Sequence, residues 1–155
     1  MQRAPALPAA AAAAAVLALL ASAAPAGRAI DQPSSIRITD RERSYRRIDE
    51  GPRGRGPGDV EIAWLTLYNR RITQKAIGHG ELLCTYLTKR SRNCTSTYFL
   101  PKGKLVVEGV IGSRLLYELP VVGGTGLYAN ARGSLVVTIR ATSPRREILT
   151  FRLQP

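Results

Sequence analysis

After residue 59 the apolar residues fall in short runs rich in Val, Ile, Leu, Thr and Tyr, and short polar or glycine-containing turns separate these runs. No window in this part of the chain shows a sustained period of 3.6 residues with helix caps. Runs of this composition between turn residues are typical of β-strands. We therefore expect strands over seven stretches, namely 60–69, 75–87, 94–100, 104–111, 113–122, 127–141 and 147–153.

A further strand is expected at 36–49, although its alternation is less regular and its charge is high. The Gly- and Pro-rich stretch 50–59 cannot join a ladder and predicts a loop. Eight strands joined by hairpin-sized turns favour an all-β, up-and-down antiparallel barrel with a central cavity. Such a barrel is wide enough to be filled by side chains or to hold one small ligand. The alternative, a two-sheet sandwich, needs longer crossover connections than the sequence provides.

The first 26 residues have the three parts of a secretory signal peptide. A basic start is followed by an apolar run at 9–21 and by small residues at 21–26. The alternative is a retained membrane anchor, but the run is shorter than the ~20 residues of a membrane span. We expect a secreted protein of the extracellular space or cell envelope, with a flexible leader at 27–35 and a barrel domain at 36–155.

The two cysteines, Cys84 and Cys94, lie in adjacent strand-like runs on either side of a polar turn. A hairpin centred near Lys89 brings them opposite each other, and export exposes them to an oxidising compartment. We expect a disulfide that stabilises the fold by roughly 3 kcal/mol. A metal site or a catalytic thiol lacks partners, because the chain has one histidine and no second cysteine pair.

The formal net charge is +12, with 19 Arg and 4 Lys. Such a chain attracts anions in general, but no run interleaves basic and aromatic residues as a nucleic-acid platform does. We expect no nucleic-acid partner. The densest basic cluster is interspersed with acids, which favours a mixed, solvated face. Its members are Asp40, Arg41, Glu42, Arg43, Arg46, Arg47, Asp49 and Glu50.

The glycine-rich stretch 121–137, VVGGTGLYANARGSLVV, lacks the third glycine of a dinucleotide fingerprint, and a strand-like run follows it where that fingerprint needs a helix. A phosphate loop is therefore disfavoured. A glycine hairpin turn at 123–126 fits the pattern better.

Nucleophilic catalysis has little support, because His79 stands alone between glycines and no G-x-S-x-G elbow exists. Acidic and tyrosine side chains within the strands are candidates for a pocket wall or for acid–base work, although each can equally be a solvated or core residue. The acids are Glu81, Glu108 and Glu118, and the tyrosines are Tyr68, Tyr86, Tyr98, Tyr117 and Tyr128.

The motif GGTG…ARG at 123–133 resembles the signature of dirigent proteins and of allene-oxide-cyclase-like barrels. Further pieces of the sequence that precede this motif occur in the same order as in that group, including GPGD, HGELLCTYL and FLPKGKLVVEGVI. The resemblance covers roughly residues 40–153 and is greatest with exported bacterial members of this group. It implies an eight-stranded barrel with an apolar cavity, often a homodimer or homotrimer, that needs no metal or organic cofactor.

The resemblance also implies two catalytic residues in the pocket, Asp49 at the end of the first strand and Arg132 of the A-R-G motif. Alternation over 127–140 instead turns Leu135 and Val137 inward and Arg132 to solvent. A partner subunit against the apolar face, or a bulge at Gly133, would reconcile the two.

Two functions follow as hypotheses. One is a secreted barrel that binds a small apolar or phenolic molecule, with pocket candidates Tyr68, Glu81, Tyr86, Glu108 and Tyr128. As an enzyme it would be isomerase- or cyclase-like and cofactor-free, and it would work by positioning a reactive intermediate. The alternative is a non-enzymatic basic envelope or interaction module that binds anionic polymers.

Overall fold

The computed structural model describes residues 33–69 and 75–154, which form eight strands and no helix. The strands are β1 (Ser35–Ile48), β2 (Val60–Tyr68), β3 (Gly78–Tyr86), β4 (Arg92–Leu100), β5 (Gly103–Ile111), β6 (Leu116–Gly126), β7 (Arg132–Thr142) and β8 (Arg145–Gln154). Consequently, no helix that could cross a membrane occurs within these two ranges. The expected signal peptide, 1–26, lies outside them.

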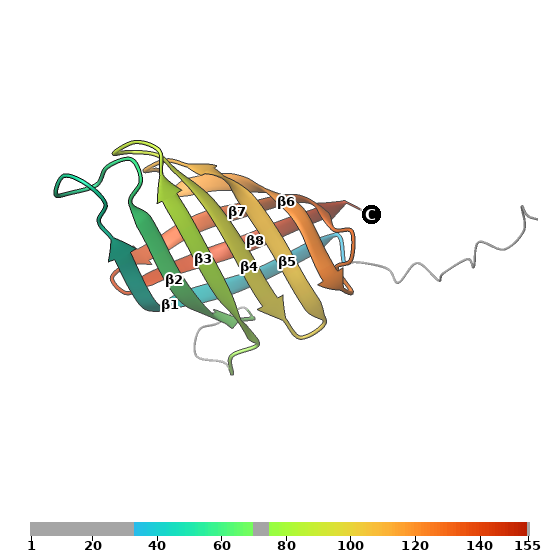
Figure 1. The fold of residues 1–155 in the computed structure, drawn as a ribbon. Coiled ribbons are helices and arrows are strands. Elements are labelled where there is room, and N and C mark those ends of the chain that lie inside the picture. The colour runs from blue at the N-terminus through green and yellow to red at the C-terminus, as the bar shows by residue number, and fades with distance from the viewer. Residues whose placement is uncertain (1–32, 70–74, 155) are drawn as a thin grey trace, which may run out of the picture.

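Each strand pairs antiparallel with the next, and β8 pairs with β1, so that the sheet closes (Figure 1). The predicted up-and-down barrel is confirmed, and the two-sheet sandwich is excluded. The charged stretch expected at 36–49 forms β1, which closes the barrel between β2 and β8. The stretch 50–59 is a loop, as its glycines and prolines predict.

The two halves of the barrel interior differ in polarity. The half near the chain termini is filled by fully buried apolar side chains, among them Leu67, Leu105, Leu135, Leu149 and Phe151. The other half opens at the end that carries loop 49–59 and turn 87–91, seen at the left of Figure 1. We call this opening the mouth end.

The enclosed space inside the barrel is small, about 20 Å³, which is room for about one water molecule. The wide apolar cavity implied by the resemblance is therefore absent from this part of the barrel. Side chains such as Leu65, Tyr98, Tyr117 and Leu119 occupy it instead, because an eight-stranded barrel is only just wide enough for its own side chains.

The predicted disulfide is present between Cys84 and Cys94, which face each other across β3 and β4. Both side chains are buried at the barrel wall, and Cys94 also lines the enclosed space. The link thus fixes the register of β3 and β4 next to the polar half of the interior.

The glycine motif does not form the turn expected at 123–126. Residues 123–126 instead end β6, and the chain turns at 127–131 before β7 begins at Arg132. Gly124 is packed so closely that a Cβ would lie 2.3 Å from the Tyr128 carbonyl oxygen and 2.6 Å from that of Lys104. The motif therefore permits close backbone approach between β5, β6 and the turn.

We predict that Gly124→Ala destabilises the barrel by about 1–3 kcal/mol, because the added methyl group clashes with two backbone oxygens that cannot move independently. Gly123→Ala is the matched control, since its Cβ would meet only the Arg132 side chain at 4.0 Å. Urea unfolding of both variants measures the difference. Equal stabilities would contradict the packing role of Gly124.

Candidate functional site

The inward-facing acids of the mouth end share the inner face of their strands with buried apolar residues. Glu61 is in phase with Ala63, Leu65 and Leu67 on β2, and Glu147 is in phase with Leu149 on β8. On β1, a bulge between Glu42 and Ser44 shifts the phase, so that Tyr45 lies opposite Ala63 and turns inward.

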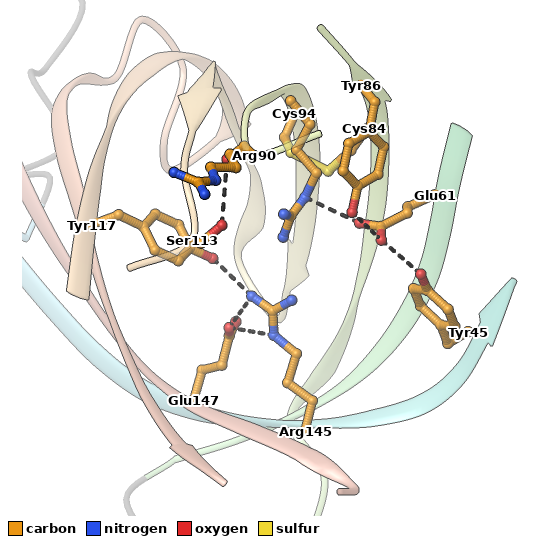
Figure 2. A network of polar contacts seen from close by, with 11 residues as sticks. Tyr45, Glu61, Cys84, Tyr86, Arg90, Cys94, Ser113, Tyr117, Arg145 and Glu147 are labelled. Carbon is orange, nitrogen blue, oxygen red and sulfur yellow. Dashed lines mark hydrogen bonds and ion pairs between the residues drawn. A yellow bond between two sulfur atoms is a disulfide. The ribbon is translucent and has the colours of Figure 1, made fainter. Parts of the chain in front are cut away.

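A first group, the glutamate–tyrosine cluster, consists of Tyr45, Glu61, Tyr86 and Arg92. The hydroxyl groups of Tyr45 and Tyr86 each donate to Glu61 Oε1 at 2.6 Å (Figure 2). Arg92 Nε lies 3.0 Å from Glu61 Oε2 and forms an ion pair without hydrogen-bond alignment. Three side chains from β1, β3 and β4 thus hold one buried carboxylate from β2.

Glu61 stays ionised despite its burial. Desolvation alone would raise its pKa, but the hydrogen bonds from Tyr45 and Tyr86 and the charges of Arg92 and Arg55 lower it below its ordinary value. Conversely, burial and the bond to Glu61 raise the pKa of Tyr45 to about 12. The cluster is therefore a carboxylate that accepts from two neutral phenols.

A second group, the arginine–glutamate cluster, consists of Asp40, Tyr117, Arg145 and Glu147. Arg145 lies between Glu147 and Tyr117 (Figure 2), donating from Nε to Glu147 Oε1 at 2.6 Å and from a terminal nitrogen to the Tyr117 hydroxyl at 3.1 Å. A terminal nitrogen of Arg145 also pairs with the Glu147 carboxylate. Burial raises the pKa of Tyr117 well above its ordinary value, so its hydroxyl stays neutral.

Asp40 lies directly across the β1–β8 ladder from Glu147 and is completely buried. Its Oδ1 accepts from the Glu147 backbone N–H at 2.8 Å, while its Oδ2 has no hydrogen-bond partner. Burial and the negative charge of Glu147 raise the pKa of Asp40 to about 8. Asp40 therefore favours its neutral form at pH 7, next to the Arg145–Glu147 pair.

The two clusters border one pocket of about 300 Å³ at the mouth end, which we call the mouth pocket. It is lined by Glu42, Tyr45, Arg55, Glu61, Arg92, Ile139, Thr142 and Arg145. Four of these residues also line the small enclosed space, so the pocket sits directly above it. Its size suits a small organic molecule.

Loop 49–59 forms one side of this pocket and is fixed by Asp59. The Asp59 carboxylate accepts from the backbone N–H groups of Glu50 and Gly56 at 2.9 and 3.0 Å. The hydrogen bond from Glu50 lowers the pKa of Asp59 against the effect of burial. The loop thereby carries Arg55 to 6.0 Å from the centre of the Tyr86 ring.

The two catalytic residues implied by the resemblance lie apart from both clusters. Asp49 follows the end of β1, pairs with Arg47 at 3.5 Å and accepts from the Gly54 backbone. Arg132 is exposed, as the alternation over 127–140 predicts. Its guanidinium group donates to the carbonyl oxygens of Val122 and Ala131. The register runs unbroken through Gly133, and the bulge of β7 lies between Ile139 and Ala141.

Of the five pocket candidates, Tyr86 alone belongs to a cluster at the mouth pocket. Glu81 and Glu108 are exposed on the outer faces of β3 and β5, and Tyr68 lies on the outer side of β2. Tyr128 is buried at the opposite end, beside a depression lined largely by apolar residues and by no acid. His79 stacks on Phe99 across β3 and β4.

Sequence reasoning missed six residues of the site, namely Asp40, Tyr45, Glu61, Arg92, Arg145 and Glu147. A signal existed for three of them, since Asp40, Glu61 and Glu147 interrupt the apolar phase of their strands. Within 33–69 and 75–154 no group of three or more His, Cys, Asp or Glu side chains has the arrangement of a metal site. What the site offers is a held carboxylate, neutral phenols and guanidinium groups around one pocket.

We predict that the free energy of unfolding of the wild-type protein falls, relative to that of the Asp40→Asn variant, as pH rises from about 4 to 8. The pKa of Asp40 is about 8 in the folded state against 3.8 for the free side chain, so over this range the folded state binds more protons than the unfolded state. Its unfolding free energy then declines by up to about 1.4 kcal/mol per pH unit. Urea unfolding across this range measures the effect, and Glu81→Gln, on the outer face, should track the wild type. Parallel curves for Asp40→Asn and wild type would contradict the assignment.

No protein-family model matches the sequence, and no curated protein matches it significantly. Several solved structures are similar to this chain. Pyocyanin demethylase superposes with a TM-score of 0.67 at 23% sequence identity, over 77% of this chain and 99% of that chain. The pterocarpan synthase dirigent protein GePTS1 superposes with a TM-score of 0.61 at 17% identity, over 77% of this chain and 81% of that chain. The Diels–Alderase AbmU from Streptomyces koyangensis superposes with a TM-score of 0.61 at 16% identity, over 78% of this chain and 65% of that chain. The chain therefore has the barrel fold of dirigent proteins, as the GGTG…ARG motif predicts, and it shares this fold with Diels–Alderase-type cyclases.

Proposed function

We propose that the protein is a secreted barrel that binds a small apolar or phenolic molecule in the mouth pocket and guides its cyclisation or coupling. The observation that carries this proposal is the convergence of the glutamate–tyrosine and arginine–glutamate clusters on one pocket. The similar structures support it, since those named above are a demethylase, a dirigent protein and a Diels–Alderase. Function on a shared fold rests on the site, so this chain's own residues decide what the pocket can bind.

We assign the ligand to the mouth pocket because the Glu61 carboxylate, the Tyr45 phenol and the guanidinium groups of Arg92 and Arg145 meet there. The enclosed space beneath it holds only about 20 Å³, and the depression of about 560 Å³ at the opposite end has no acid in its lining. The side chain of Ile139 and the ring of Tyr45 offer apolar contact at its wall. The Tyr45 side chain is 47% exposed although its hydroxyl donates to Glu61. A ligand phenol has the same chemistry as the Tyr45 side chain and can take over its hydrogen bond to Glu61.

Three groups then orient the ligand. Glu61 accepts a hydrogen bond from the ligand hydroxyl, while Arg92 and Arg145 stabilise negative charge that develops on an oxygen atom. The protein itself only positions the reactants. In a coupling reaction an external one-electron oxidant takes an electron from each of two phenols, each phenol releases a proton to solvent, and the two resulting radicals form the new bond. Rate and selectivity come from holding a reactive intermediate in one conformation.

We predict that Glu61→Gln weakens binding of a phenolic probe, 1-naphthol, by about tenfold, because the charge-assisted acceptor is lost. Binding of naphthalene, which has no hydroxyl, should change less than about twofold. Glu81→Gln, which removes an exposed acid from the outer face of β3, should leave both affinities unchanged. Isothermal titration calorimetry measures all three.

Two results would contradict the proposal. One is the absence of 1-naphthol binding to the wild-type protein. The other is an equal loss of affinity in Glu61→Gln and Glu81→Gln, which would place the ligand elsewhere or make the effect one of net charge. A guiding role is tested separately, by comparing the isomer ratio of products from oxidative coupling of a phenol with and without the protein.

Secretion is part of the proposal and rests on the signal-like residues 1–26. We predict that the exported protein begins near residue 27 and that the Cys84–Cys94 disulfide is formed in it. N-terminal sequencing and thiol titration of the cell-free medium or envelope fraction measure both. A cell-associated chain that keeps Met1 would contradict export.

A further inference from the structure

The outer face of β8 and β1 carries arginine and no acidic residue. Asp40, Glu42 and Glu147, the three acids of these strands, line or lie within the barrel interior. The mixed, solvated face expected around residues 40–50 is therefore wrong for β1, because alternation turns its acids inward and leaves its arginines outside. The neighbouring strands β2 and β7 add no acid to this outer face, since Glu61 also points inward and β7 has none.

Seven exposed arginines follow these strands, and we call them the arginine face. They are Arg37, Arg41, Arg43 and Arg46 on β1, Arg140 at the bulge of β7, and Arg146 and Arg152 on β8. The ion pairs formed among the described residues involve Arg47, Arg92 and Arg145, so none of the seven is neutralised by an acid of 33–69 or 75–154.

The arginines stand in two neighbouring rows. Arg41 lies directly opposite Arg146 in the β1–β8 ladder, and Arg37 and Arg152 lie further along, opposite Thr150 and Ser35. At about 3.3 Å per residue, Arg146 and Arg152 are about 20 Å apart along the strand. Like charges directly opposite each other are unfavourable in a sheet, and a bound polyanion would remove this repulsion.

The side chains between the arginines indicate what kind of polyanion fits. The outward residues of β1 and β8 include Ser35, Thr39, Ser44 and Thr150, which offer hydroxyl groups. The outer faces of β1 and β8 themselves carry no aromatic side chain on which nucleic-acid bases could stack. The neighbouring outer face of β2 carries Trp64 opposite Ser44 and Tyr68 opposite Thr39. Apolar side chains between the arginines are too few for a membrane surface. Arginine forms two parallel hydrogen bonds with a carboxylate or sulfate group.

We propose that the arginine face binds a linear acidic polysaccharide laid along β1 and β8, at a site separate from the mouth pocket. Carboxylate or sulfate groups of successive sugars pair with the arginine rows, and sugar hydroxyls meet the serine and threonine side chains. The protein would thus hold to an anionic matrix through its wall while its mouth stays open to small molecules.

The test compares two variants that lose equal charge. R37Q/R41Q/R146Q/R152Q removes four charges from the arginine face, and K89Q/R90Q/K102Q/R114Q removes four from turns outside it. The probe is a fluorescently labelled polyuronate oligosaccharide, with binding followed by fluorescence anisotropy at low salt. We expect the first variant to bind at least tenfold more weakly than wild type, and the control less than about threefold.

Equal weakening by the two variants would overturn the proposal, since net charge would then account for binding. Tighter binding of single-stranded DNA or of phosphatidylglycerol vesicles than of the polyuronate would overturn the polysaccharide assignment. Because the substituted side chains point to solvent, we expect the face variant to unfold at no lower urea concentration than wild type. R41Q/R146Q repeats the test with half the substitutions. Unchanged 1-naphthol affinity in the face variant would support the independence of the two sites.

Discussion

The pairing of β1 with β8 closes the barrel and decides where every charge on these strands lies. At two successive positions of this ladder, side chains of the same kind face each other. The acid Asp40 lies opposite the acid Glu147, and Arg41 lies opposite Arg146. The inner acid pair is tolerated because burial raises the pKa of Asp40 to about 8, which keeps it neutral, and because Arg145 neutralises Glu147. The outer arginine pair is tolerated because water screens it. A one-residue slip would exchange the two sides and bury the arginines without partners.

The polar half of the interior depends on a second constraint, the bulge of β1 between Glu42 and Ser44. Before the bulge, Ile38, Asp40 and Glu42 point inward, and without it Tyr45 would point to solvent. The bulge restores the inward direction at Tyr45, which then lies opposite Ala63 and within reach of Glu61. Bulges commonly redirect a side chain near a functional site. Here one extra residue completes the set of donors around the glutamate.

The sequence predicts the fold far better than the site. Short runs of strand-forming residues and the turns between them are local signals, so the number and order of strands, the hairpin and its Cys84–Cys94 link follow from them directly. Within the strands, the period of two also places Glu61 and Glu147 inside, because both share a phase with buried leucines, whereas Glu81 and Glu108 share one with exposed residues. The partners of these acids cannot be found in this way. Tyr45 depends on a bulge, and the approach of Arg145 to Tyr117 depends on how side chains fill the closed barrel.

The balance of charge around Glu61 limits which ligands the mouth pocket can accept. Glu61 already has two phenol donors and one guanidinium, so a ligand gains little from charge alone and must exchange a hydrogen bond. Tyr86 is 2% exposed and Tyr45 is 47% exposed, which makes Tyr45 the donor that a ligand can replace at the lower cost. Tyr86 and Arg92 would meanwhile keep the carboxylate in place. A ligand that brings its own hydroxyl group replaces the Tyr45 donor, whereas one that brings only an acceptor leaves the Glu61 carboxylate one donor short, at a cost of about 1–3 kcal/mol. Under the proposed function, this geometry favours hydroxyl-bearing molecules over other apolar ones.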